Sequence, residues 1–341
     1  MIVNPWTVSA LSLDIASAGL GLITAGLCIK QFSASSSIEA ESGEQISNIE
    51  NRLYLLFWLG AVFLLLRFLA WPLFYLTLHS LIPEITGAMC IFGARNLQPV
   101  LSRSLELIKP LLFYSGLVWL LLFKLERFGN REGAESSARK SSLILLCFCI
   151  ITGLTDSISS IILWLRSNAE LAVSCCTTVT DIPSRFTIWI PESLFGDQYA
   201  SLLWILYFTS NAVLFTGALF IRSRLIKGIT GIIPLLSLLI LIIFNSVIGT
   251  FAFIEVISPT LMKLPFHHCL YCLVQNVIDA PIFVGLFVLG NSLVAAMFPV
   301  WFLSKKWAEA SALIALLSWL LLAGTLCLSG SVLMIITHLL R

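Results

Sequence analysis

Charged side chains are scarce in this sequence of 341 residues. Asp, Glu, Lys and Arg make up 11% of it, against 58% hydrophobic residues, whereas soluble globular domains carry about 25% charged residues. This composition cannot cover a soluble surface, which excludes a water-soluble enzyme and a disordered chain. The net charge of only +2 excludes a nucleic-acid-binding protein, which needs a basic stripe. A polytopic protein of the lipid bilayer remains.

Eight apolar runs are long enough to cross a membrane as helices, which takes about 20 residues each. They are continuous, unlike the short alternating strands of a membrane barrel. The sequence therefore predicts an all-α helical bundle in which residues 1–341 form a single transmembrane domain, although eight spans would also allow a four-plus-four duplication. The first run lacks the basic start of a cleavable signal peptide. The runs are 8–29, 53–79, 105–123, 141–165, 199–221, 228–257, 273–303 and 310–338.

Lys and Arg in the short loops predict the orientation, because they are enriched on the cytoplasmic side. Five of them lie in 124–140, which we expect to be a flexible cytoplasmic loop, as is 32–50. Both termini are then outside. Segment 166–198 becomes an outer cap loop, and 80–104, broken by prolines and glycines, an outer re-entrant or interfacial segment. The predicted location is a bacterial inner membrane with these outer segments facing the periplasm.

This orientation collects most of the reactive side chains on the outer side. Such a concentration of thiol and imidazole groups points to redox or metal chemistry at that face. Five of the nine cysteines and all four histidines fall in outer segments or at the outer ends of spans: Cys90, Cys175, Cys176, Cys269, Cys272, His79, His267, His268 and His338.

The most specific motif is His-His-Cys-x-x-Cys at residues 267–272. A cysteine at the start of a helix has a lowered pKa, because the helix dipole and a neighbouring imidazolium favour the thiolate. The motif predicts Cys269 as a reactive thiol and Cys272 as its disulfide partner, with His267 and His268 tuning the thiolate and moving protons. Both cysteines could instead pack as apolar side chains, as we expect for Cys28, Cys147, Cys149 and Cys327.

Polar residues follow this motif at helical spacing. Gln275, Asn276 and Asp279 come three, four and seven residues after Cys272, which places them on one face of a continuous helix. Asp279 is then predicted about two turns into the membrane, as a proton relay or a ligand. The same residues would also serve as interhelical hydrogen-bonding groups.

Other spans carry isolated charges. Arg67 in the second and Asp156 in the fourth are expected to pair, and Glu255 adds one charge to the sixth. An ionisable side chain in a membrane usually faces the bundle interior and takes a partner.

Cys175 and Cys176 are adjacent in the outer loop. Adjacent cysteines rarely bond to each other, so each is expected to pair elsewhere or both to bind a soft metal. A structural disulfide to Cys90 is the simpler alternative in an oxidising compartment. Met89, beside Cys90, adds another soft ligand.

Residues 268–276 resemble the DsbB and vitamin K epoxide reductase group of membrane thiol–disulfide oxidoreductases. The DsbB-like pattern Pro-Cys-x-x-Cys-x-x-Gln-Arg is matched at Cys269, Cys272 and Gln275, while His268 and Asn276 replace its proline and arginine. The resemblance implies a Cys269–Cys272 pair beside a bound quinone. By position only, it implies Cys175 and Cys176 as loop cysteines that exchange with a soluble thiol protein.

Three functional hypotheses follow. The leading one is a thiol–disulfide oxidoreductase that passes electrons between the outer cysteines and a membrane carrier such as quinone. The second is a zinc- or copper-binding or transport protein, and the third a non-catalytic subunit of a larger membrane complex. Haem with His79 and His338 as axial ligands is a further alternative. The metal hypothesis uses His267, His268, Cys269, Cys272, Cys175, Cys176, Met89 and Cys90.

Overall fold

The chain is an integral membrane protein built from helices. The computed structural model describes residues 2–35, 43–128, 135–168, 173, 176–182, 186–228, 231–305 and 308–340. Over those residues there is no strand, and eight helices are long and apolar enough to cross a bilayer. The predicted all-α bundle with eight spans is confirmed. The spans are Pro5–Gln31, Asn51–Glu84, Pro99–Glu126, Ser141–Arg166, Tyr199–Ile226, Ile232–Met262, Ala280–Ser304 and Ala310–Leu339.

The helices extend beyond the apolar runs into polar sequence. The sequence predicts flexible loops at 32–50 and 124–140. That prediction is wrong at the two ends of each segment, because those ends are helical. Residues 36–42 and 129–134 lie outside the described residues. Glu, Gln, Lys and Arg are strong helix formers, so a helix need not end where its hydrophobic stretch ends. The four helices concerned are α1 (Pro5–Ser35), α2 (Gly43–Leu81), α4 (Pro99–Phe128) and α5 (Glu135–Arg166).

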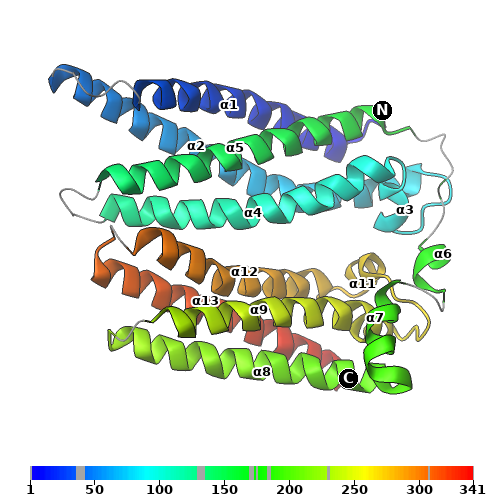
Figure 1. Cartoon of the computed structure of the whole chain (residues 1–341). Helices are drawn as coiled ribbons and strands as arrows, with labels where there is room; N and C mark the ends of the chain where they lie inside the picture. The colour runs from blue at the N-terminus through cyan, green and yellow to red at the C-terminus, as the bar shows by residue number, and fades with distance from the viewer. Residues whose placement is uncertain are drawn as a thin grey trace. The chain divides into compact units, whose positions relative to one another are not determined.

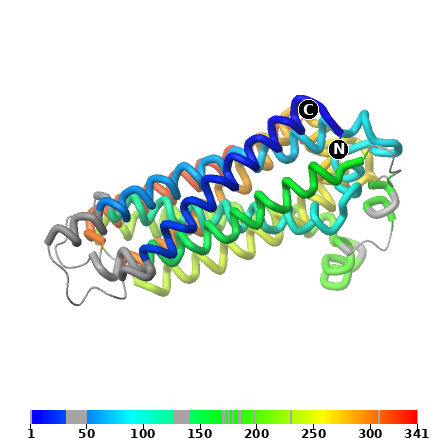
Figure 2. Tube along the Cα trace, turned by 90° about the horizontal axis from the view of Figure 1, so that it is seen from above, coloured from blue at the N-terminus to red at the C-terminus, as the bar shows by residue number. Residues whose placement is uncertain are grey.

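The chain divides into two compact units, Met1–Val173 and Ser174–Arg341. In the first, helices α1, α2, α4 and α5 each pack against their neighbours in the cyclic order α1–α2–α4–α5. They lie lengthwise beside one another in both views (Figures 1 and 2). Segment 80–104 contains a 3-10 turn (η2, Ile82–Glu84) and a short helix (α3, Ile91–Arg95) before α4 begins.

Four buried charges occupy the interior of the first unit. The predicted pair of Arg67 and Asp156 is present, and Arg67 also bonds Asp14 at 2.6 Å. Lys109 Nζ lies 2.9 Å from the other carboxylate oxygen of Asp156. Two acids and two bases therefore balance, which is the condition under which charges persist in a low-dielectric core.

A disulfide joins Cys28 of α1 to Cys147 of α5. The expectation that both cysteines only pack in the core is wrong. Helices α1 and α5 lie against each other and bring the two Cα atoms to 6.8 Å, within the reach of a disulfide. No spacing in the sequence reports this contact between residues 119 positions apart.

The second unit has the same helix order as the first. Its long helices pack in the cycle α8–α9–α12–α13, again side by side in the figures. In both units the connection between the second and third long helix contains short helices and at least one cysteine. Each unit thus has four long helices, a four-plus-four arrangement that eight spans allow. The bounds are α8 (Tyr199–Ile226), α9 (Ile232–Ala252), α12 (Ala280–Ser304) and α13 (Ala310–Leu339).

Uncharged amides replace the charged cluster in the core of the second unit. Buried Asn245 donates to Asn291 at 3.2 Å and accepts from Ser210 at 2.8 Å. Asn291 in turn donates to the carbonyl of Phe287 at 2.7 Å. These bonds tie α8, α9 and α12 together without placing a net charge in the bilayer.

Candidate metal centre

One turn of helix fixes the first cysteine of the site. Cys176 is the N-cap of α6 (Thr177–Thr180), and the backbone N–H of Thr180 donates to its carbonyl at 2.8 Å. Asp181 follows directly after this turn. The local fold thus places a thiol and a carboxylate at the two ends of a single helical turn.

The loop after the sixth span positions the other ligands. Helix α10 (Ser258–Met262) ends at Lys263, which has a left-handed backbone with φ of 55°. The N–H of His267 then donates to the carbonyl of Leu264 at 3.0 Å. Cys269 is the N-cap of α11 (Leu270–Asn276), so Cys272 comes one helical turn later. The predicted helix start at the Cys-x-x-Cys motif is confirmed.

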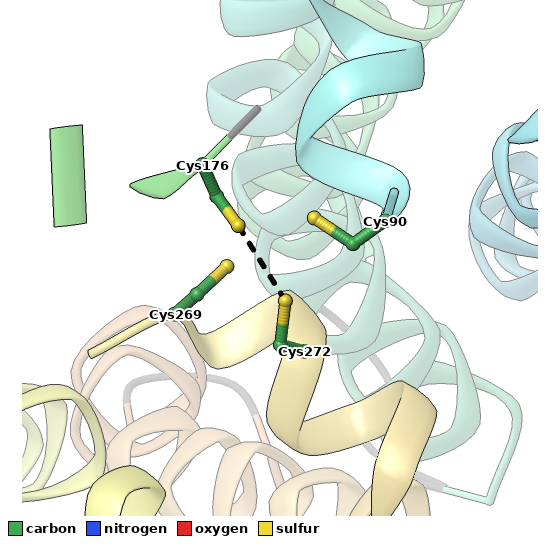
Figure 3. Close-up of side chains that lie close together, drawn as sticks. All are labelled: Cys90, Cys176, Cys269 and Cys272. Carbon is green, nitrogen blue, oxygen red and sulfur yellow. Dashed lines mark hydrogen bonds between the residues drawn. The ribbon is translucent and has the colours of Figure 1, made fainter. Parts of the chain in front are cut away.

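Three cysteines of the second unit converge in space. Figure 3 shows the side chains of Cys176, Cys269 and Cys272 pointing toward one another. Their sulfur atoms lie within 4.8 Å of one another, and the Sγ atoms of Cys176 and Cys272 are 3.6 Å apart. All three are buried, and none is in a disulfide.

His267 adds an imidazole to this thiol cluster. Its Nε2 lies 3.9 Å from the Sγ of Cys176, and its Nδ1 lies 2.9 and 3.0 Å from the two carboxylate oxygens of Asp181. A carboxylate at Nδ1 favours the tautomer with the proton there, which leaves the Nε2 lone pair facing the Cys176 sulfur. Metal-binding histidines commonly have this carboxylate–histidine arrangement.

The distances agree with a tetrahedral ion. With Zn–S bonds of about 2.3 Å and Zn–N bonds of about 2.0 Å, neighbouring sulfurs are about 3.8 Å apart, and sulfur and nitrogen about 3.5 Å. The observed separations are 3.6 Å for Cys176 and Cys272 and 3.9 Å for Cys176 and His267. Cys176, Cys269 and Cys272, with His267 beside Cys176, offer the ligand types of a Cys₃His set, one of the usual zinc ligand sets.

The structure does not bring His268 into this cluster. Its Nδ1 faces Glu255 at 3.6 Å instead. Cys175 lies outside the described residues. Cys90 is buried in the first unit without a disulfide, so the alternative of a disulfide from the outer loop to Cys90 is not seen among the described residues. Met89, in the same unit, is 72% exposed.

The predicted continuous helix through Asp279 is wrong. Helix α11 ends at Asn276, Val277 is extended, and Asp279 is the N-cap of α12. Pro281 explains the break: it has no N–H to donate to the carbonyl of Val277, and its ring would clash with that carbonyl in a continuous helix.

The polar residues after the motif consequently separate. Gln275 is exposed, and Asn276 donates to the carbonyl of Cys272 at 2.9 Å. Asp279 lies 3.2 Å from His338 Nε2, with 42% of its side chain exposed, rather than deep in the membrane. The haem alternative uses His79 and His338 as axial ligands. His338 has a carboxylate partner in Asp279. His79 is an exposed residue of the first unit.

Sequence reasoning missed Asp181. Its role depends on the loop 176–182 meeting the loop that carries His267, and no periodicity or local motif reports such a contact. An acidic residue five positions after a candidate ligand cysteine is too common a pattern to stand out.

The fold and these contacts define an all-α polytopic membrane protein whose second unit contains a cluster of buried thiols beside a partly exposed imidazole. No protein-family model, curated protein or solved structure matches the chain.

Proposed function

We propose that this membrane protein binds a transition-metal ion, best matched by Zn²⁺, through Cys176, His267, Cys269 and Cys272. The observation that carries the proposal is the orientation of His267, with one ring nitrogen toward Cys176 and the other on Asp181. A histidine that merely packs in a core has no need of a carboxylate on one ring nitrogen and a thiol, itself part of a thiol cluster, at the other.

The ligand set favours a closed site. Three thiolates and one imidazole fill the four positions of tetrahedral zinc and leave none for a water or a substrate. Zinc bound in this way holds loops together or stores the ion; it does not activate water. In this protein it would fasten the loop of Cys176 to the loop of Cys269 and Cys272. Cu⁺ is the second choice, since it also binds thiolates.

We infer the location of the site from the distribution of Lys and Arg. It places the end of the second unit that carries the cysteines outside, which in a bacterial inner membrane is the periplasm. Labelling Cys327→Ser protein in intact cells with a membrane-impermeant thiol reagent, after the metal is chelated, tests this. Modification of Cys176, Cys269 and Cys272 supports the orientation, and protection until the membrane is broken contradicts it.

Metal content and thiol reactivity test the function together. Purified protein is expected to contain about one zinc per chain, as Cys₃His sites do. The three cysteines should resist alkylation until a chelator is added, with no reductant needed. Cys176→Ser and Cys272→Ser should lower the zinc content, whereas Cys149→Ser and Cys327→Ser, which change thiols in helices α5 and α13, should not.

A thiol–disulfide oxidoreductase is the second candidate, favoured by the 3.6 Å between the sulfurs of Cys176 and Cys272. In that reaction two thiols lose two electrons and two protons to form a disulfide, and a quinone takes both to become a quinol. The same alkylation experiment separates the two functions. Cysteines that open only to a reductant, in protein without metal, support the oxidoreductase and contradict zinc binding.

A further inference from the structure

An open cleft of about 760 Å³ lies in the second unit, within the usual size range of ligand sites. Its walls come from α7 (Phe186–Phe195), the start of α8, the π-helical turn η4 (Phe253–Ile257) and the loop before α11. Three carboxylates line it, Asp181, Glu192 and Glu255, against one lysine, Lys263. The lining is therefore acidic and favours cations.

The most buried charge in this lining is Glu255, whose side chain is fully buried beside His268. Glu255 belongs to the π-helical turn, a backbone irregularity that is frequent at functional sites. Its carboxylate oxygen is 3.6 Å from His268 Nδ1, which exceeds a direct hydrogen bond. An ion bound to both atoms at about 2.0 Å would separate them by about 3.3 Å in tetrahedral geometry.

The cleft adjoins the metal centre through two shared elements. Asp181 both lines the cleft and bonds the imidazole of His267. His267 and His268 are consecutive, yet one faces the thiols and the other faces Glu255 in the cleft wall. His267 and Asp181 are also the partly exposed side of the centre, since the three cysteines are buried.

We propose that Glu255 and His268 form a transfer station from which a divalent cation in the acidic cleft is loaded onto the thiol site. The inference rests on the proposed metal binding and adds its route. Two protein ligands hold an ion weakly, which suits transfer rather than storage. In the loading step the ion leaves the Glu255 oxygen and His268 Nδ1 and bonds three sulfurs and His267 Nε2. Each sulfur that binds releases one thiol proton to water.

Loading kinetics with Co²⁺ test this route. Full-length protein in detergent is stripped of metal under reducing conditions and mixed rapidly with Co²⁺, whose bonds to thiolate give a strong absorption that reports arrival at the thiol site. Glu255→Gln and His268→Gln are each expected to slow the second-order loading rate about tenfold, the lower end of electrostatic effects on association rates. The final absorption and stoichiometry should not change.

A matched pair in the same unit provides the control. His338 and Asp279 also form a histidine–carboxylate contact, at 3.2 Å, but neither lines the cleft. His338→Gln and Asp279→Asn are expected to load at the wild-type rate. Glu192 is an exposed residue of α7. Glu192→Gln should slow loading at low salt only, because salt screens the attraction between this carboxylate and the cation. This variant also tests the route if a change at buried Glu255 prevents folding.

The outcomes separate this inference from the proposed function. If wild-type protein shows no cobalt–thiolate absorption, metal binding itself fails. If wild-type protein binds Co²⁺, but the Glu255, His268 and Glu192 variants all load at its rate, the thiol site stands and the transfer station is overturned.

Discussion

His267 Nδ1 lies 2.9 Å from a carboxylate oxygen of Asp181, while Nε2 of the same ring lies 3.9 Å from the Cys176 sulfur. Asp181 therefore orients the imidazole whose other nitrogen faces Cys176. Asp181→Asn is expected to weaken zinc binding about 10- to 100-fold, as is usual for such supporting carboxylates. Competition with a chelator of known affinity measures this. Asp279→Asn, which alters the carboxylate at His338, should bind as wild type; equal losses in both variants would contradict the role of Asp181.

Acid should release the metal, because protons compete with it for the three thiolates. Below the pKa of the thiols, forming three metal–sulfur bonds displaces up to about three protons, so affinity falls as the pH falls. Chelator competition between about pH 6 and about pH 8 should show this steep dependence. Cys269→Ser removes one thiol and should flatten the slope along with lowering the affinity. An affinity independent of pH is incompatible with thiolate ligands.

The disulfide between Cys28 and Cys147 is expected to stabilise the first unit. It closes a loop of 119 residues, and removing a constraint of this kind costs about 2–4 kcal/mol of stability. The double variant Cys28→Ala/Cys147→Ala should therefore unfold at a lower temperature in detergent. Reductant should lower the melting temperature of wild type but leave that of the double variant unchanged. A double variant that melts as wild type would show that the bond contributes nothing.

Arg67 should be the most sensitive charge in the first unit. It is buried between Asp14 and Asp156, so Arg67→Met leaves two carboxylates with Lys109 as the remaining buried cation. Removing one partner of a buried ion pair typically costs about 3–5 kcal/mol. The melting temperature and the yield of monodisperse protein report the loss.

A less buried ion pair in the same unit provides the comparison. Arg95 contacts Glu106 at 2.6 Å with both side chains partly exposed. Arg95→Met is expected to cost much less, because solvent compensates the charge that remains. Equal effects of the two substitutions would argue against a special role for the buried network.

Hydrophobic runs predicted the spans because a bilayer demands about 20 apolar residues per helix. The motif at residues 267–272 correctly indicated a helix start, but the sequence could not show that α11 is only seven residues long. Pro281 indicated a break in the helix, but the apolar residues around it predicted one continuous span. The partners of His267 and Cys28 lie on other helices and loops, so their contacts depend on tertiary packing that local patterns do not encode.

The crossing of α12 and α13 depends on two glycines. A Cβ atom added at Gly290 would lie 2.9 Å from the carbonyl oxygen of Gly324 and 2.7 Å from a side-chain carbon of Leu328. Small residues at such a crossing let the helix backbones approach closely. Gly290→Val is therefore expected to push the helices apart and cost about 1–3 kcal/mol, as overpacking does.

Gly285 on the same helix is the matched control, since an added Cβ meets nothing within 4 Å there. Gly285→Val should leave the melting temperature in detergent nearly unchanged, while Gly290→Val lowers it. If both variants melt alike, close packing at Gly290 does not hold α12 and α13 together. A normal zinc content in a destabilised Gly290→Val protein would further show that the loops of the metal centre tolerate a shift between these two helices.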